Sequence, residues 1–257
     1  LDGGDNYGVW TRSVYEPMQS AVINQAIRMR QEGDNLRALM EKYYADDKKS
    51  FKDFIAERGG FTITREELIA LAMQYTSTED NRAKLLDFYE KKHGWDEEFI
   101  RDVLTQMRAK DWQFVMGVRD LYESFWAETS AIEKRRFGYA PEKLEGLPTE
   151  TFTTVDGTDI DVRGGYARIK YDSRHSFKTM ANDLKDAYKE LAIGSSSIAA
   201  TKRGSMKERK ASSGQAIRLD LDVIGEHIAE QVGIITMSEA VENTAKVLRQ
   251  DNVQEVS

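Results

Sequence analysis

Residues 110–137 read KDWQFVMGVRDLYESFWAETSAIEKRRF. Large apolar side chains recur in them at steps of three and four, the spacing that places residues on one face of an α-helix. The pattern predicts one long helix and a fold built mainly from helices. It also predicts that Trp112, Phe125 and Trp126 are buried in a core. The apolar positions are Trp112, Phe114, Val115, Val118, Leu121, Tyr122, Phe125, Trp126 and Ile132.

The residues upstream repeat this helical pattern. A first helix is expected to begin near Glu16 and to end at Gly33, and Thr64 and Glu67 have the spacing of a capping box. The first 140 residues therefore read as a helical domain. The first helix carries apolar positions Val14, Met18, Val22, Ile23, Ala26, Ile27 and Met29, and further helices are expected over about 36–44, 51–57, 65–75, 82–92 and 96–107.

The periodicity changes after residue 150. Asp156-Gly157, a dipeptide typical of hairpin turns, separates two short alternating segments, and residues 164–171 alternate again. A helix over 177–193, a loop rich in Gly, Ser and basic residues over 194–217, and two short helices over about 222–232 and 238–249 follow. We therefore expect a mainly α fold: a multi-helix bundle or array with a small β-hairpin insertion (about 151–171) and C-terminal helices, where residues 141–257 form a small α+β region.

Composition excludes several classes of protein. The 257 residues contain no Cys, so disulfide scaffolds, thiolate metal sites and Cys nucleophiles are excluded. No apolar run approaches the roughly 20 residues of a membrane-spanning helix. The net charge is -7, and neither half of the chain is a basic nucleic-acid domain. The phosphate-loop, dinucleotide, nucleophile-elbow and zincin motifs are absent, and the three His residues show no zinc-ligand spacing. We therefore expect no cofactor and no metal, and assign no catalytic residue.

A polar loop follows the last predicted strand. It contains Asp172, Arg174 and His175. These three side chains could form an acid/base pair with a clamp for an anion. Alternatively, Asp172 caps a turn and pairs with Arg174. The other two His residues, His93 and His227, read as structural, His93 because it lies at a helix end beside Gly94.

A basic loop is the other candidate site. Five basic residues and one acidic residue lie within nine positions of a segment flanked by Gly and Ser. Such a loop can contact a phosphate backbone and release counterions, or it can be a solvated loop that pairs with the acidic helices before it. The five candidate residues for nucleic-acid binding are Lys202, Arg203, Lys207, Arg209 and Lys210.

Three blocks of sequence resemble a known family. They are FGYAPEKL (137–144), GGYARIKYDSR (164–174) and LDLDVIGEHI (219–228), with basic positions of the loop between the last two. This pattern resembles that of the large polyvalent proteins of tailed phages and mobile elements, and the helices over 10–30 and 112–133 are similar as well. Ala167 stands where the family usually has Pro. The additional His residues that the family tends to show after His227 are missing from residues 232–239, so any metal or acid/base role of theirs is missing too.

The resemblance implies a setting for the chain. Proteins of this family include internal virion or ejection proteins, which are packaged in the capsid and delivered to the host cell with the genome. We therefore expect a non-enzymatic virion component that assists delivery or protection of DNA. Its expected partners are other virion or ejection subunits and non-specific DNA. Because the chain begins with Leu1, we expect it to be a piece of a longer chain or oligomer.

Two alternatives stay open. One is an enzyme or enzyme-associated module that acts on nucleic acid through residues 171–175 and the basic loop at 202–210. The other is a protein-binding adaptor that uses the acidic helical half, where the first 150 residues carry 22 basic and 28 acidic side chains.

Overall fold

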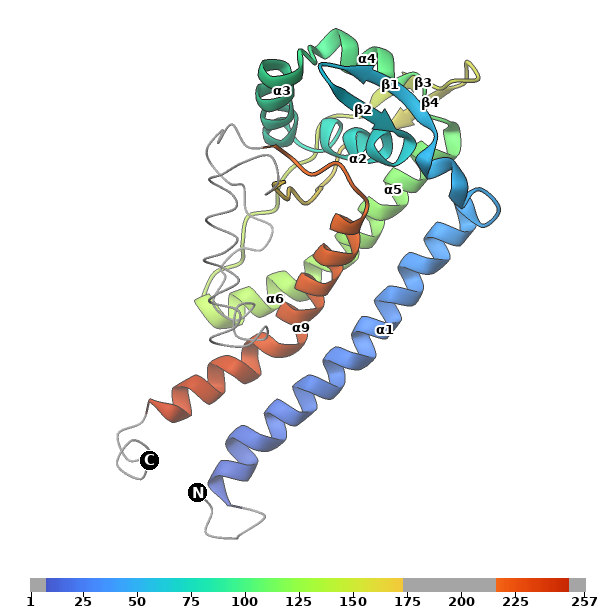
Figure 1. Cartoon of the computed structure of the whole chain (residues 1–257). Helices are drawn as coiled ribbons and strands as arrows, with labels where there is room; N and C mark the ends of the chain where they lie inside the picture. The colour runs from blue at the N-terminus through green and yellow to red at the C-terminus, as the bar shows by residue number, and fades with distance from the viewer. Residues whose placement is uncertain (1–7, 173–215, 250–257) are drawn as a thin grey trace.

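Two long helices, α1 (Glu16–Tyr44) and α9 (Asp222–Leu248), pack against each other in antiparallel directions and form an arm (Figure 1). A head lies at the end of the arm where α1 ends and α9 begins. Helix α5 (Ala109–Ser124) leads from the head along the arm, and α6 (Trp126–Phe137) continues it. This computed structural model describes residues 8–172 and 216–249.

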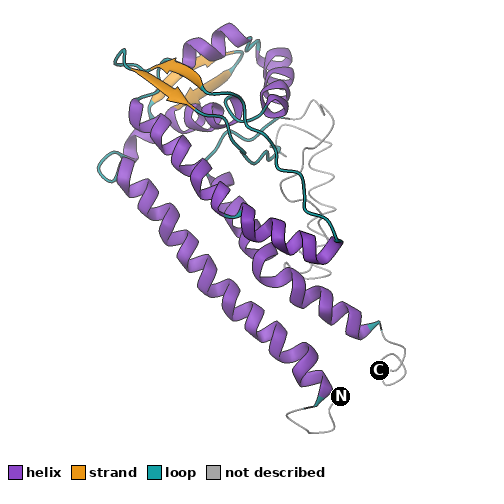
Figure 2. Ribbon diagram, turned by 180° about the vertical axis from the view of Figure 1, so that it is seen from behind, coloured by secondary structure: helices purple, strands orange, loops and turns teal. Residues whose placement is uncertain are grey.

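The head combines three helices with two β-hairpins, which Figure 2 shows together at one end of the molecule. The predicted mainly α fold class is confirmed. The elements of the head are α2 (Arg65–Tyr75), α3 (Glu79–His93), α4 (Glu97–Leu104), β1 (Phe54–Arg58) paired with β2 (Phe61–Thr64), and β3 (Glu150–Thr153) paired with β4 (Asp159–Val162). Two short helical turns, Thr11–Tyr15 and Lys48–Lys52, flank α1.

Local sequence signals position the helices of the head. Thr64 accepts a hydrogen bond from the Glu67 amide, and the Glu67 carboxylate accepts one from the Thr64 amide, so the predicted capping box is formed. Asp96 caps α4 with a single hydrogen bond, which its carboxylate accepts from the Phe99 amide. Gly94 ends α3 in the left-handed conformation, with φ 67°. These caps satisfy amide and carbonyl groups that a helix end leaves unpaired.

The hairpin of β1 and β2 corrects an expectation. The sequence predicted a helix over 51–57, but Phe54–Arg58 is a strand that turns back through Gly59 and Gly60, at φ 63° and 73°. Two successive residues with positive φ make the tight turn that suits the twist of a hairpin. A Cβ at Gly59 would come within 2.2 Å of the carbonyl oxygen of His93, so this turn also packs closely on the end of α3.

The predicted hairpin at Asp156-Gly157 is present as β3 and β4, with Phe152 opposite Ile160. The further strand expected over 164–171 is reduced to one bridge, between Tyr171 and Ile217. The two short C-terminal helices expected over 222–232 and 238–249 are one continuous helix, α9. The helix expected over 177–193 lies outside the described residues.

Two helix boundaries also differ from expectation. Helix α1 continues through Gly33 to Tyr44, because the residues on either side of the glycine pack along the arm. The long helix predicted over 110–137 is interrupted at Phe125, which divides it into α5 and α6. Trp112 and Phe125 are fully buried as expected, whereas Trp126 is only half-buried.

The core of the head is aromatic. Trp95 stacks on Tyr89 with ring centroids 4.5 Å apart, and Phe61 of β2 contacts both rings edge-on. Trp112 of α5 packs on Phe152 of β3 at 4.7 Å, which joins the second hairpin to the helices. Buried aromatic rings supply large apolar areas and specific geometry, so they hold short hairpins onto the helices.

A buried carboxylate ties three helices together at the junction of head and arm. Asp111 near the start of α5 is fully buried and accepts hydrogen bonds from the hydroxyl of Tyr44 (2.8 Å), from Arg65 (3.0 Å) and from Arg108. These partners come from the end of α1, the start of α2 and the residue before α5. Burial, with Asp111 beside it, raises the pKa of Tyr44 far above its usual value, so Tyr44 stays a donor.

The inner seam of the arm is polar at its middle. Arg28 of α1 pairs with Glu32 (2.7 Å) on its own helix and with Glu128 of α6 (3.0 Å). Thr129 of α6 donates to Gln231 of α9 at 3.1 Å. The arm is therefore held by polar contacts as well as by apolar packing.

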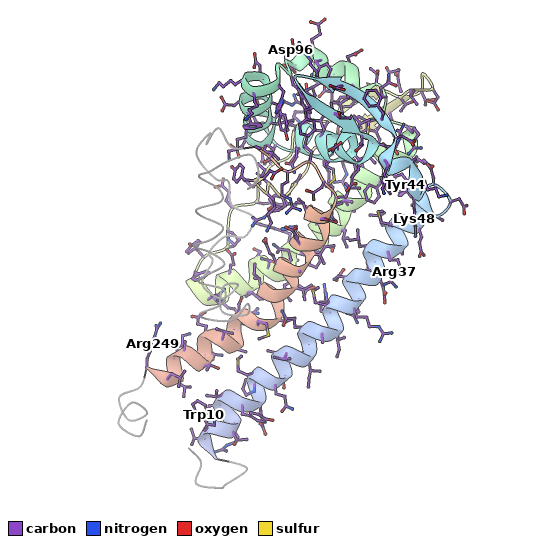
Figure 3. The ribbon with its side chains drawn as sticks, viewed as in Figure 1. Trp10, Arg37, Tyr44, Lys48, Asp96 and Arg249 are labelled. Carbon is purple, nitrogen blue, oxygen red and sulfur yellow. The ribbon has the colours of Figure 1, made fainter. Side chains whose placement is uncertain are left out.

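Both ends of the described chain lie at the end of the arm away from the head. Figure 3 shows Trp10 and Arg249 at this end, whereas Tyr44 and Lys48 lie near the head. Among the described helices, none has a stretch with the length and apolar character needed to span a membrane.

Candidate functional site

The structure describes one of the eight candidate site residues. Asp172 is described and buried. Arg174 and His175 lie outside the described residues, and so do the five candidates of the basic loop, Lys202, Arg203, Lys207, Arg209 and Lys210.

Asp172 lies where the segment that ends at residue 172 pairs with the segment that begins at residue 216. Its amide donates to the carbonyl of Ala216 (2.7 Å), and the amide of Arg218 donates to the carbonyl of Lys170 (2.8 Å). Two backbone hydrogen bonds on either side of the Tyr171–Ile217 bridge fix this pairing. The predicted polar loop therefore starts from an ordered position beside the beginning of α9.

The side chain of Asp172 lines a cavity of about 340 Å³, the Asp172 cavity. Its other polar groups have structural partners: Glu67 belongs to the capping box, His93 Nδ1 lies 2.8 Å from the Gly59 carbonyl oxygen, and the hydroxyl of Tyr89 donates to Ile217 (2.7 Å). Burial, together with Asp172, raises the pKa of Tyr89 above its usual value. This cavity thus brings an Asp near a His, and the His is His93 of α3.

A larger cleft of about 520 Å³ lies between α5, α6 and the segments around residues 143–146 and 163–166. We call it the Tyr166 cleft. Its charged residue Arg119 is buried, and it donates to the carbonyl oxygens of Arg163 and Met73 and to the hydroxyl of Thr76. Burial, with Arg163 nearby, lowers the pKa of Arg119 to about 10.

Arg119 donates hydrogen bonds to the C-terminal end of α2. Met73 and Thr76 are at the C-terminal end of α2, where carbonyl groups lack partners and the helix dipole favours a cation. The other charged pairs of this cleft are on its rim: Lys143 pairs with Glu123, and Arg163 pairs with Asp120 beside the cleft. The Arg119 side chain is therefore held by the fold.

Behind the cleft, His227 of α9 is completely buried against two tyrosine rings. The ring of Tyr122 lies 4.5 Å from its ring and that of Tyr166 5.2 Å. Neither ring nitrogen has a hydrogen-bond partner within the described ranges. Burial lowers the pKa of His227, so the ring is neutral at pH 7. The burial of His227 agrees with a core position, but its two ring nitrogens lack the partners expected of a satisfied core His, and its structural role stays a prediction.

Glu230, one turn further along α9, links this cluster to the segment before Asp172. Its carboxylate pairs with Arg168 (2.9 Å) and Lys170 (2.6 Å), and lies 4.0 Å from His227, beyond hydrogen-bond range. Burial on its own would raise the pKa of Glu230, but these neighbours hold it well below its usual value. The carboxylate therefore stays ionised and anchors residues 168–170 to α9.

No group of three or more His, Asp or Glu side chains that could hold a metal ion occurs in residues 8–172 and 216–249. Most polar side chains of the Asp172 cavity and the Tyr166 cleft make contacts within the fold, although the buried hydroxyl of Tyr122 and Nε of Arg119 have no hydrogen-bond partner among the described residues. The remaining candidate is a surface.

The outer surface of α1 is apolar over a stretch where a solvent-facing helix would normally be polar. Val22, Ile23 and Ile27 are each about half exposed, at 52%, 51% and 52%. The inward positions of the same region include Glu32, which is buried. Part of the apolar pattern that predicted this helix therefore faces outward.

Comparison of the chain with protein-family models, curated proteins and solved structures finds no match. The function therefore has to be inferred from the sequence, the fold and the surface of the chain.

The sequence did not identify the exposed surface of α1. One signal was available: an apolar stripe on both sides of polar Gln25, Arg28 and Glu32 is too wide for a single buried face. Deciding which side faces α9 needs the packing of residues that are 200 positions apart, and periodicity within one helix does not contain it.

Proposed function

We propose that the chain is a non-enzymatic structural module of an internal or ejection protein of a tailed phage, packaged in the capsid and delivered to the host cell with the genome. The resemblance of residues 137–144, 164–174 and 219–228 to that family supports the setting. Its partners in this proposal are neighbouring virion or ejection subunits and the DNA itself.

The observation that carries the proposal is the local character of the secondary structure. In the described part of the chain, every sheet is a hairpin of two neighbouring segments: β1 pairs with β2, and β3 pairs with β4. Apart from the single bridge between Tyr171 and Ile217, the other regular structure of the described residues is helical, with hydrogen bonds between residues close in sequence. Individual helices and hairpins form within microseconds, whereas the packing of α1 on α9 joins the two ends of the chain and is a long-range step that follows. A module of this kind can be unfolded for passage through a narrow tail and then re-form.

DNA contact is assigned in this proposal to the basic loop, residues 202–210. Lys202, Arg203, Lys207, Arg209 and Lys210 would contact phosphates without reading bases. The head and the arm would then act as the body that holds this loop and binds other subunits.

Mass spectrometry of purified virions tests the proposal. Virions of the phage or element that encodes the chain are purified on a density gradient, and peptides of head and arm are quantified against a major capsid protein. We expect these peptides to copurify with full particles. Empty particles that have ejected their DNA serve as the control and should have lost them. Peptides found in infected-cell lysate but absent from full particles would contradict the proposal.

A further inference from the structure

The outward face of α1 lies opposite the face that packs in the molecule. At 3.6 residues per turn, Ile23 is about 180° around the helix from the buried Glu32. Figures 1 and 2 show α1 at the edge of the molecule, with no described element on its outer side. Exposed positions continue along this face at helical spacing: Arg12, Glu16, Gln19, Ile23, Ile27, Arg30 and Asp34.

The charges on this face are arranged symmetrically about Ile23. Glu16 and Arg30 each lie seven residues from Ile23 and have opposite charges. Arg12, in the π-helical turn before α1, and Asp34, which also pairs with Arg37 of its own helix (2.9 Å), each lie eleven residues from it and have opposite charges. In two identical antiparallel helices that cross at Ile23, a residue meets the one at the same distance on the other side. Glu16 therefore meets Arg30 of the second copy and Arg12 meets Asp34, whereas the exposed Arg37 and Glu41 of the same face lie beyond these pairs.

We propose that the outward face of α1 binds the same face of a second copy of this chain, in an antiparallel arrangement centred on Ile23. The two-fold axis passes between the two Ile23 side chains, with Ile27 of each copy beside Gln19 of the other. Glu16 of one copy pairs with Arg30 of the other, and Arg12 pairs with Asp34. The same surface thus serves both copies, as in most symmetric dimers.

The charges on this face favour a second copy of the chain as its partner and favour an antiparallel orientation of the two helices. A parallel pair would place Glu16 beside Glu16 and Arg30 beside Arg30, and like charges across an interface oppose binding. The half-exposed Val22, Ile23 and Ile27 supply the apolar area that is removed from water. Positions at steps of three and four give two helices a continuous seam.

The shape of the molecule leaves room for this pairing. Asp34 is ten residues before the end of α1 at Tyr44, where the head begins. With Ile23 at the centre, Gly8 of the second copy lies opposite residue 38, before the end of α1 at Tyr44. The two heads then lie at opposite ends of the pair.

The size of the seam predicts a reversible dimer. Residues 12–34 span about 33 Å of helix, and a single helix pair of this length is at the small end of specific interfaces. We therefore expect monomer and dimer to exchange at micromolar protein concentrations. This inference goes beyond the proposed function and does not depend on it, because a dimer would form in any biological setting.

Sedimentation equilibrium of the full chain over a range of concentrations tests the pairing. We expect a dimer that dissociates on dilution, and a loss of more than about tenfold in dimer affinity for Ile23→Asp. The matched control is Val155→Asp, which places the same charge on an exposed apolar residue of the head (54% exposed) and should leave dimerisation unchanged. A wild-type chain that stays monomeric at hundreds of micromolar would overturn the proposal.

A charge swap tests the direction and register. Glu16→Arg and Arg30→Glu should each weaken the dimer by about tenfold, because each places two like-charge pairs in the seam. The double variant Glu16→Arg/Arg30→Glu only inverts each pair, so it should restore wild-type affinity. Because both side chains are exposed, the single variants keep the fold, and circular dichroism checks this. A double variant as weak as the single variants combined would contradict the antiparallel register even if a dimer forms.

Crosslinking gives an independent readout. The chain has no Cys, so Gln19→Cys and Ile27→Cys each introduce a single thiol. An oxidised mixture of the two variants should form a covalent heterodimer, whereas Arg37→Cys with Ile27→Cys should not. Equal crosslinking of both mixtures would reject the proposed register.

Discussion

Asp111 is the residue on which three helices depend. Its buried carboxylate is shared by Tyr44, Arg65 and Arg108. Breaking a buried ion pair by neutralising one member leaves the other charges with less compensation and costs several kcal/mol. We predict that Asp111→Asn lowers the free energy of unfolding by about 3 kcal/mol, measured by urea denaturation at pH 7. Asp120→Asn, whose pair with Arg163 is on the surface, should be nearly neutral. An equal loss in both variants would contradict this role.

His227 gives the fold a defined dependence on pH. Burial lowers its pKa in the folded protein, whereas a His in an unfolded chain titrates near about 6.5. Below about pH 6.5 the unfolded state binds more protons than the folded state. The contribution of His227 to the free energy of unfolding is therefore complete above this pH. Stability is then lost as the pH falls from about 6.5 toward the folded-state pKa.

We predict that the wild-type free energy of unfolding falls as the pH decreases from about 6.5 to 5.5, by up to about 1.4 kcal/mol per pH unit from this group alone. His227→Phe keeps a ring against Tyr122 and Tyr166 and should flatten this part of the profile. Chemical denaturation at four or five pH values measures it. His93→Gln, which removes an imidazole outside this cluster, is the comparison variant. An unchanged profile in His227→Phe would assign the pH dependence to other groups.

At the scale of elements, the two tryptophans of residues 110–137 differ in how much of each side chain is buried. Trp112 is fully buried against Phe152, whereas Trp126 is half-buried beside the Tyr166 cleft. We predict that Trp112→Ala costs about 3–5 kcal/mol of stability and detaches the β3–β4 hairpin from α5. Trp126→Ala should cost less than about half of that, because less apolar area is buried. Urea denaturation of both variants measures the difference, and equal losses would contradict it.

Elements with their own chemical signal could be predicted from the sequence. The capping box at Thr64, the cap at Asp96 and the Asp156-Gly157 turn each place a boundary through contacts within a few residues. Residues 51–57 could not be assigned in the same way. A short apolar run fits a helix or a strand, and Gly59-Gly60 ends a helix as readily as it turns a hairpin. The packing of the turn on His93 decides between them.

Long-range features are the part that the sequence could not predict. Asp172 could be selected as a polar residue after a strand, but its pairing with Ala216 crosses more than forty residues. The orientation of α1 depends on α9, at the other end of the chain. Gly33 remains helical because contacts of the arm outweigh its cost of about 1 kcal/mol.

At the scale of the whole molecule, the acidic chain should bind DNA through one place only. If the basic loop contacts phosphates, affinity should be weak, independent of sequence and steeply dependent on salt. Five contacts predict a log–log salt slope of about -4.5 on duplex DNA. Changing Lys202, Arg203, Lys207, Arg209 and Lys210 together to Ser should flatten this slope, as fluorescence anisotropy at several salt concentrations can measure.

The control for this titration is a second basic group on the surface. Lys48, Lys49 and Lys52 are exposed after α1, and changing them to Ser should leave the slope unchanged. Two results count against the loop: no DNA affinity at low salt, or an equal effect of the control.

The position of the two chain ends has a mechanical consequence. Residues 8 and 249 lie at the same end of the arm, and α1 and α9 run antiparallel from there. A force that pulls the two ends apart therefore acts across the helix pair and separates it from the open end, one contact after another. Separation in this geometry needs less force than sliding two helices past each other, since few contacts resist at any moment. The contacts nearest residues 8 and 249 would separate first, the polar seam around Arg28 at the middle of the arm next, and the aromatic head would unfold last.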